Sequence, residues 1–125
     1  MSNLLLFGDF PALALSGMPN IAIIEADTSG FVGLLPTEIG LLTTVAYLDL
    51  GSNTLSGTIP TEVGLMTSLQ YLALNFNFLS GTIPSEFGSL PNLETLELQD
   101  NVMDYTIPET LLNNTELTII TAPTT

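Results

Sequence analysis

The chain has 125 residues, of which 46% are apolar, and its 13 Asp and Glu with no Lys, Arg or His give a formal charge of −13. Without cationic side chains a protein cannot neutralise phosphates, so nucleic-acid binding is close to excluded and attachment to an anionic membrane surface is disfavoured. The charge instead favours basic or polar protein partners, divalent ions, or a saline medium that screens repulsion.

The length predicts one domain. The segment Met1–Phe10 lacks a basic start, and its apolar run over residues 4–7 is short, so we expect no signal peptide in it. No stretch reaches the ~20 apolar residues that a membrane span needs. Cys is absent, so the sequence contains no disulfide framework.

A 24-residue pattern recurs three times between residues 33 and 104. The copies read GLLPTEIGLLTTVAYLDLGSNTLS, GTIPTEVGLMTSLQYLALNFNFLS and GTIPSEFGSLPNLETLELQDNVMD. A fixed period of this length predicts a solenoid, in which each turn buries its apolar face against its neighbours. The pattern continues in both directions, so we expect one array over residues 1–125 with about five strands.

In chain order, we predict a partial first turn, four full repeats, and a last strand with its tail. Their ranges are 1–17, 18–41, 42–65, 66–89, 90–113 and 114–125. In the last range Leu117, Ile120 and Ala122 each lie 24 residues after a leucine of the preceding copy, so we expect them to be the equivalents of inward-facing residues.

Within each copy a short segment, such as VAYLDL or LQYLAL, alternates apolar and other residues. This alternation is typical of a half-buried strand. Identical turns stacked side by side make these strands a parallel sheet with a spacing of about 4.8 Å. The residues predicted to face the core are Leu48, Leu50, Leu72, Leu74, Leu96 and Leu98, with Leu55, Leu79 and Met103 below them.

Asn53, Asn77 and Asn101 recur where the chain turns inward after each strand. A side-chain amide has two donors and an acceptor, so each Asn can satisfy main-chain groups of its own turn and the next one. Ser29 takes this place in the first full turn as a weaker version of the same device. Glycines at positions 33, 57 and 81 suit a backbone conformation that a side chain would deny.

Prolines at positions 36, 60 and 84 fix φ and lack an N–H, which suits an irregular segment outside the main sheet. Each is followed by Thr or Ser and then by Glu, a sequence that resembles a helix start with a hydroxyl near the cap and an acid in the first turn. We therefore expect one short helical turn of 3₁₀ type at residues 61–66 and their equivalents.

The combined motif, LxxLxLxxNxLSGTIPxE followed by an apolar residue and Gly, resembles the plant-type leucine-rich repeat over about residues 8–125. This resemblance implies an α/β solenoid with a short parallel β-sheet on the concave side and 3₁₀ or irregular segments on the convex side. It also implies a non-enzymatic role in the extracellular space, at the cell surface or in an organelle lumen. Members include receptor-like ectodomains and algal extracellular proteins.

The solvent-facing positions of the sheet are the candidate partner-binding site. Tyr and Phe side chains on a rigid sheet are good anchors for a protein partner or for sugar rings. The second interpretation, compatible with the first, is that stacked Tyr rings stabilise the sheet as cross-strand pairs. The predicted site residues are an aromatic stripe, Ile23, Tyr47, Tyr71 and Thr95, its flanking residues Phe76 and Phe78, and an acidic column, Glu25, Asp49 and Glu97.

The acidic column is also consistent with a plain solvated face. A calcium site needs roughly six to eight converging oxygens, and one carboxylate per turn does not supply them, so we predict no metal site and no cofactor. Without His, Cys or Lys the chain has no usual nucleophile activator, and we predict no catalytic residue.

A ladder of hydroxyl residues offers a third interpretation, in which regular hydroxyls order water as on an ice-binding face. The ladder consists of Thr58, Thr82 and Thr106 with Thr37, Thr61 and Ser85. The remaining acidic column, at positions 38, 62 and 86, is explained by proximity to N–H groups of the helical turns. The sequon that begins at Asn113 would suit surface glycosylation if the chain is secreted.

The ends of the array support an alternative function. A solenoid needs polar capping units, because an open end exposes both the core and a strand edge. Here the first strand carries an apolar run at residues 21–24, and the last strand carries another at residues 117–120. The alternative to a protein- or glycan-binding module is therefore a structural subunit of a larger assembly or filament, joined end to end.

Overall fold

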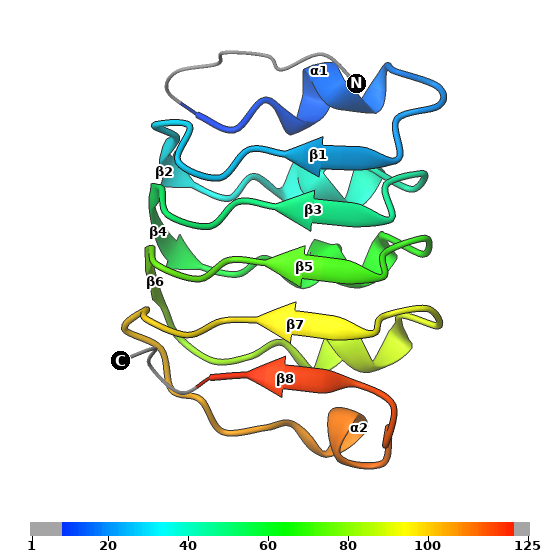
Figure 1. Cartoon of the computed structure of the whole chain (residues 1–125), viewed down its shortest axis with the longest axis vertical. Helices are drawn as coiled ribbons and strands as arrows, with labels where there is room; N and C mark the ends of the chain where they lie inside the picture. The colour runs from blue at the N-terminus through cyan, green and yellow to red at the C-terminus, as the bar shows by residue number, and fades with distance from the viewer. Residues whose placement is uncertain (1–8, 122–125) are drawn as a thin grey trace.

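A computed structural model describes residues 9–121, which wind into a solenoid of stacked turns (Figure 1). Predictions that concern residues 1–8 and 122–125, including the equivalence of Ala122 to an inward-facing leucine, lie outside the described residues. Two parallel sheets and a series of short helical turns run along the stack. No helix of the described part is long and apolar enough to cross a membrane.

The main sheet contains five parallel strands in the order β1-β3-β5-β7-β8, which confirms the predicted parallel sheet. The central residue of each strand points inward, and Leu48, Leu72 and Leu96 are completely buried. The strands are β1 (Ile23–Glu25), β3 (Tyr47–Asp49), β5 (Tyr71–Ala73), β7 (Thr95–Glu97) and β8 (Thr118–Ile120).

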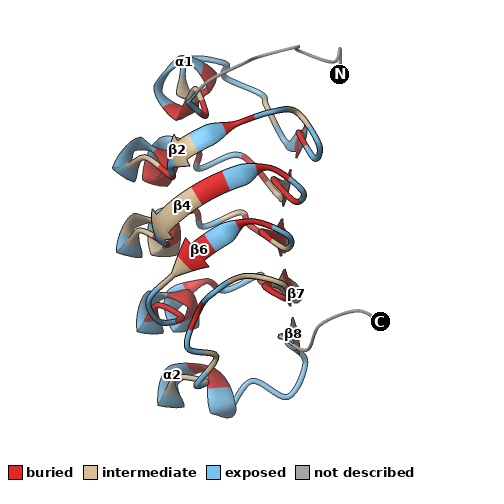
Figure 2. Ribbon diagram, turned by 90° about the vertical axis from the view of Figure 1, so that its left-hand side faces the viewer, coloured by how far each residue is buried: buried red, intermediate tan, exposed pale blue. Residues whose placement is uncertain are grey.

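A second sheet, absent from the prediction, lies along one flank of the stack (Figure 2). We call it the side sheet; its parallel strands are β2 (Val32–Leu34), β4 (Thr54–Thr58) and β6 (Phe78–Ser80). Each strand is offset from the repeat, so that Ser56 pairs with Phe78 rather than with its own equivalent. Each strand pairs with a strand of the adjacent turn because the stacked turns supply a hydrogen-bonding neighbour.

Three 3₁₀ turns lie on the side opposite the main sheet, as predicted: η1 (Thr37–Leu41), η2 (Thr61–Leu65) and η3 (Ser85–Ser89). The N-cap of η2 is Pro60, and no side chain caps the turn. The expected hydroxyl lies one position further in, where Thr61 Oγ1 is 3.4 Å from Glu62 Oε1. One-turn α-helices replace the 3₁₀ turns near the ends, at α1 (Ala12–Ser16) and α2 (Glu109–Leu112).

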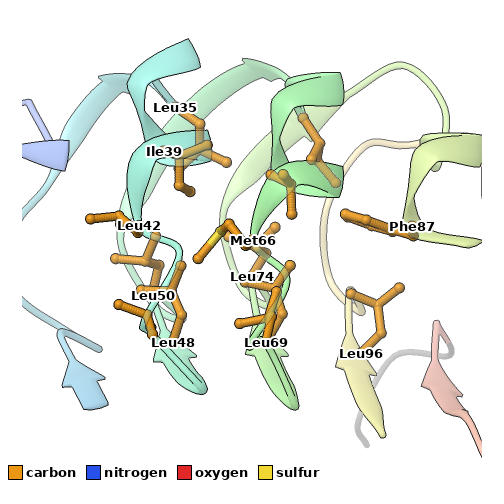
Figure 3. Packing of buried hydrophobic residues seen from close by; sticks show 14 of the residues in the cluster. Leu35, Ile39, Leu42, Leu48, Leu50, Met66, Leu69, Leu74, Phe87 and Leu96 are labelled. Atoms are coloured by element: carbon orange, nitrogen blue, oxygen red, sulfur yellow. The ribbon is translucent and has the colours of Figure 1, made fainter. Parts of the chain in front are cut away.

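The core fills the space between the main sheet and the 3₁₀ turns (Figure 3). Every leucine predicted to face the core is buried, as is Met103. Each turn adds the same set, for example Leu48 and Leu50 from the strand side with Ile39 and Leu42 from the other side. Because burial of one such side chain contributes about 1.5–3 kcal/mol, stacking of turns is the main source of stability.

Asn53, Asn77 and Asn101, which we call the Asn ladder, join the two sheets, and the structure confirms that each bonds main-chain groups of its own turn and of an adjacent one. Asn53 Nδ2 donates to the carbonyls of Leu50 at 2.9 Å and of Ala26 at 3.0 Å, while its Oδ1 accepts from the Phe31 N–H at 3.0 Å. Asn77 and Asn101 repeat this arrangement. The bonds connect each turn to the preceding one, rather than to the next one as we expected.

The last turn departs from the predicted register. Leu96 pairs with Ile119, and Glu97 pairs with Ile120, so the repeat is one residue shorter here than in the preceding turns. A shift of one residue moves a side chain to the opposite face of a strand. The prediction that Ile120 corresponds to the inward-facing Leu96 is therefore wrong, whereas Leu117 packs against the core as predicted.

The two ends of the described chain differ. At the first turn Phe10 and Leu15 are buried, and the Phe10 ring meets Phe31 edge-on at 5.4 Å. At the other end Ile119 and Ile120 of the edge strand β8 are half-buried. Residues 10–15 thus bury part of the first turn, with α1 packed against η1, and end-to-end assembly through the two ends of the array stays a prediction.

Candidate functional site

The outward-pointing side chains of the main sheet form a surface that we call the concave face. Strand pairing aligns them in two rows, because parallel strands of equal length repeat with the same register. This surface unites every predicted partner-binding residue except Phe76 and Phe78. The aromatic row is Ile23, Tyr47, Tyr71, Thr95 and Thr118, and the acidic row is Glu25, Asp49, Ala73, Glu97 and Ile120.

Two tyrosines dominate the concave face. The rings of Tyr47 and Tyr71 are stacked, with centroids 4.3 Å apart and planes inclined by 6°. The Tyr71 hydroxyl donates a hydrogen bond to the carboxylate of Glu97 on the neighbouring strand. Ala73, which interrupts the acidic row, is 1% exposed. The stack and the hydroxyl bond fix the rings as a rigid, half-exposed aromatic platform.

The acidic row gives the platform a negative potential. Burial is the main cause that raises the pKa of Asp49, and the neighbouring charges of Asp27 and Glu97 raise this pKa further. The 3.0 Å hydrogen bond that the Gly51 N–H donates to the carboxylate opposes the rise. The pKa of Tyr47 is raised first by burial and then by the Asp49 charge. Both shifts arise because negative charge accumulates where part of the solvent is excluded.

The chemistry available at this site is recognition. Among residues 9–121 no three or more carboxylates or other metal-ligating side chains lie close enough together to hold a metal ion. The face presents aromatic rings, carboxylate acceptors and the hydroxyl of Thr95. Such groups bind a partner through stacking, hydrogen bonds and charge.

The two phenylalanines lie elsewhere. Phe78 belongs to β6 of the side sheet and is 59% exposed, so it does not flank the tyrosines as the sequence suggested. Phe76 lies between the two sheets with a φ of 54°, a left-handed conformation shared by Thr28, Ser52 and Asp100 at the same place in other turns. The conformation is therefore imposed by the repeat. Gln99, two residues after β7, is buried.

Sequence reasoning missed a second surface, which we call the side face, made by outward residues of the side sheet (Figure 2). Val32, Leu34 and Phe78 are 45%, 64% and 59% exposed. No charged residue occurs in β2, β4 or β6. One signal in the sequence could have revealed this face: the stretches 28–37, 52–61 and 76–85 contain no Asp or Glu in a strongly acidic chain.

The remaining predicted positions lie away from the concave face. Asn113 is exposed at the C-cap of α2, which places the glycosylation candidate at the surface. Glu38, Glu62 and Glu86 belong to the first turns of η1, η2 and η3. Thr58 and Thr82, members of the hydroxyl ladder, are exposed at the edge of the side face.

The comparisons agree with this architecture. A family model described as Leucine Rich Repeat matches residues 44–66 and 68–90. With the parallel main sheet and the Asn ladder, this match shows that the chain belongs to the leucine-rich repeat family. A search of curated proteins finds no match.

Solved plant structures share the fold over most of the chain. The plant peptide hormone receptor RGFR1 in complex with RGF2 is 34% identical over 94% of this chain, with a TM-score of 0.85. The Arabidopsis receptor kinase HAESA in complex with the peptide hormone IDA and the co-receptor SERK1 is 32% identical over 94%, with a TM-score of 0.84. A plant ice-binding protein is 32% identical over 88%, with a TM-score of 0.76.

The repeat is thus of the plant type that its motif resembles. The chain spans only part of each of these proteins: 19% of the RGFR1 chain, 20% of the chain in the HAESA complex and 36% of the ice-binding protein. Likeness to a segment of a longer solenoid establishes the fold and the repeat type.

Proposed function

We propose that the chain is a non-enzymatic interaction module that binds a protein partner through the concave face. The observation that carries this proposal is the stacked pair of Tyr47 and Tyr71, held half-exposed beside carboxylates on a rigid sheet. Large aromatic side chains that are already ordered lose little entropy on binding and dominate interface energetics. Similar structures are complexes with a peptide hormone or a co-receptor.

Two finer features belong to the same proposal. Sugar rings also stack on tyrosine, so a glycan is the second ligand class for this platform. Two similar structures are named as ectodomains, one of them that of a receptor kinase, which supports an extracellular, cell-surface or lumenal location and a use for glycosylation at Asn113. The role is recognition, because the face presents no activated nucleophile.

The experiment selects ligands without presupposing one. A displayed library of random peptides is enriched on the immobilised chain, and the selected peptides are measured against Tyr71→Ala and against Phe78→Ala. These variants remove an aromatic ring from the concave face and from the side face respectively. We expect Tyr71→Ala to weaken binding at least about tenfold, the loss typical of an interface anchor, and Phe78→Ala to leave it unchanged.

The opposite pattern, or selected peptides that ignore both changes, would refute the assignment. Circular dichroism and thermal unfolding check that the variants keep the fold. If Tyr71→Ala unfolds the chain, the tyrosine pair is structural and the assignment of Tyr71 as a binding residue is wrong.

The likeness to a plant ice-binding protein favours a second candidate function, at the side face. This face is free of charge and carries exposed hydroxyl residues on parallel strands, among them Thr54 and Thr58 of β4. Strand pairing places Thr58 beside Ser80 and Thr54 beside Val32, so hydroxyl and methyl groups adjoin at the strand spacing of about 4.8 Å and face the first layer of water. The charged concave face is less suited to this role because its carboxylates bind water irregularly.

Thermal hysteresis and ice recrystallisation measurements test this candidate. Thr58→Tyr puts a large ring on the side face, while Thr67→Tyr makes the same change at an exposed position outside both sheets. Activity that falls in Thr58→Tyr and persists in Thr67→Tyr supports the candidate. No activity in the parent chain, or an equal fall in both variants, removes it.

A further inference from the structure

We propose that the concave face is specific for a cationic side chain of its partner, best an arginine, which stacks on the free face of Tyr71 above Thr95 and pairs with Glu97. This inference rests on the proposed function and names the chemistry that the concave face recognises. Its basis is the shape of the aromatic row, the position of one carboxylate, and the charge of the whole chain.

Along the aromatic row the side chains become shorter after Tyr71, and we call the position over Thr95 beside the Tyr71 ring the tyrosine notch. Tyr47 covers one face of the Tyr71 ring. The next residue in the row is Thr95, and Thr118 follows it, so only short side chains adjoin the other face of the ring. On the opposite side of the pair the neighbour of Tyr47 is Ile23, a larger residue that is 47% exposed. A flat group can therefore extend the stack on the Tyr71 side.

A carboxylate is fixed at the rim of this notch. Glu97 lies on the same strand as Thr95 and accepts the hydrogen bond from the Tyr71 hydroxyl. That bond leaves further acceptor positions on the carboxylate and restrains its side chain. A guanidinium group can stack on a ring and donate to a carboxylate at the same time, because it is planar and carries its donors in one plane.

The charge of the partner follows from what the chain lacks. The concave side carries Glu25, Asp49 and Glu97 in one row, with Asp27 and Glu94 exposed nearby. No Lys, Arg or His exists anywhere in the sequence, so no side chain of the molecule can neutralise them. An uncharged partner that covered this face would leave the carboxylates desolvated and unpaired, a strongly unfavourable state, whereas a cation compensates them.

The side face provides the internal contrast. Its strands carry exposed apolar and hydroxyl side chains but no charge, so it offers no basis for selecting a cation. If net charge alone attracted cations, they would not distinguish the tyrosine notch from other acidic parts of the surface. The inference therefore predicts site-specific binding rather than general attraction.

The test uses acetylated tri-arginine amide as the probe and tri-citrulline amide as its uncharged analogue. Binding is followed through the ring signals of ¹³C-labelled tyrosine by NMR. We expect tri-arginine to shift the signals of Tyr71 and Tyr47 saturably and to bind at least about tenfold more tightly than tri-citrulline, as expected when charge and stacking both contribute.

Two variants carry the same charge change at different places. Thr95→Arg supplies a cation inside the notch, and we expect it to weaken tri-arginine binding at least about tenfold by occupying the ring. Thr54→Arg adds the same charge on the side face, where Thr54 is exposed, and we expect a change of less than about threefold. Equal effects of the two variants, or equal binding of tri-citrulline, would overturn the inference.

The outcome is separable from that of the proposed function. Selected peptides that depend on Tyr71 but contain no Lys or Arg would leave the concave face as the binding surface and refute its specificity for cations. Tri-arginine bound in the notch, together with selected peptides that ignore Tyr71→Ala, would support the cation site and refute the proposed function.

Discussion

The concave face and the side face come from the same repeat, yet they differ in chemistry. Both are built from short parallel strands, and the same Asn ladder joins them. The concave face carries stacked tyrosines and a row of carboxylates, whereas the strands of the side face carry no charge. One structural period thus produces two surfaces of different chemistry.

The difference between the faces follows from how each is constrained. Along the side sheet the sequence LSGT at residues 55–58 of β4 returns at residues 79–82, of which the first two belong to β6. Both copies contain a glycine at positive φ, Gly57 and Gly81. In the main sheet the outward residues change from copy to copy, as in YLD, YLA and TLE. Repetition marks the positions that the fold requires, and variation marks positions that are free to serve recognition.

The largest loss of stability is expected from removing an amide of the Asn ladder, which bonds the main sheet to the side sheet. Asn77→Ala removes an amide that bonds the carbonyls of Leu50 and Leu74 and the N–H of Leu55 at 3.0–3.1 Å. These groups are buried, so we expect a loss of about 3 kcal/mol or more in the free energy of unfolding, measured by urea denaturation.

Asn92→Ala is the matched control for this prediction, because Asn92 is exposed and makes a 3.2 Å bond to the Thr67 carbonyl. We expect it to cost less than about 1 kcal/mol. Equal losses in the two variants would mean that the ladder does not hold the sheets together.

We expect a smaller loss of stability from replacing an aromatic residue, and this loss should differ between the two faces. Tyr47→Ala breaks the ring stack at 4.3 Å, and we expect thermal unfolding to show a loss of about 1–2 kcal/mol. Phe78 is 59% exposed, so we expect Phe78→Ala to cost less than about 0.5 kcal/mol. The reverse order would show that the side face, rather than the concave face, carries the stabilising aromatic contact.

The smallest effect is a difference in pH dependence between two aspartates. The pKa of Asp49 is raised from its ordinary value of 3.8, so folding stability falls as the pH rises from that value through the raised one. We expect Asp49→Asn to increase the free energy of unfolding at pH 7 by less than about 1 kcal/mol, the scale of one partly screened charge pair. The gain should vanish at pH 3.

Asp104, next to the side sheet, should show the opposite dependence of stability on pH. Hydrogen bonds from the hydroxyl and the N–H of Thr106 lower the pKa of Asp104. The ionised carboxylate therefore stabilises the fold at pH values above its ordinary pKa of 3.8, and this stabilisation is lost as the pH falls through the lowered pKa. Asp104→Asn should therefore reduce stability at pH 7. Urea denaturation of both variants at pH 3 and pH 7 checks the signs, and a gain in both would contradict this account.

The sequence predicted what the repeat determines. The spacing of Leu72, Leu96 and Asn77 placed strands, core and ladder correctly, because each position has one role in every turn. The register of Ile120 failed because the last turn is one residue shorter, a change that the apolar pattern LTII does not reveal. The side sheet was missed because its pairing is offset between turns and depends on tertiary stacking.

The candidate site also has one part that the sequence predicts and another part that it does not. The rows through Tyr47 and Asp49 follow directly from the strand period. The separation of Phe78 from them does not, because the turn after Phe76 redirects the chain into a second sheet. The hydrogen bond from Tyr71 to Glu97 also depends on side-chain geometry that a sequence pattern does not specify.

The measurement that tests the account most directly compares a cationic and a neutral nitroxide as paramagnetic probes in NMR at low salt. We predict that at 0.01 M salt, where the Debye length is about 30 Å, the cationic probe enhances relaxation over the whole molecule but several-fold more at amides of β3 and β5 than at amides of β4 and β6. At 0.1 M salt, where the Debye length is about 10 Å, the two probes should act equally at amides of β4 and β6. At the higher salt the contrast should persist at β5 next to the tyrosine notch. Uniform enhancement over both sheets would contradict the claim that the two faces accept different partners.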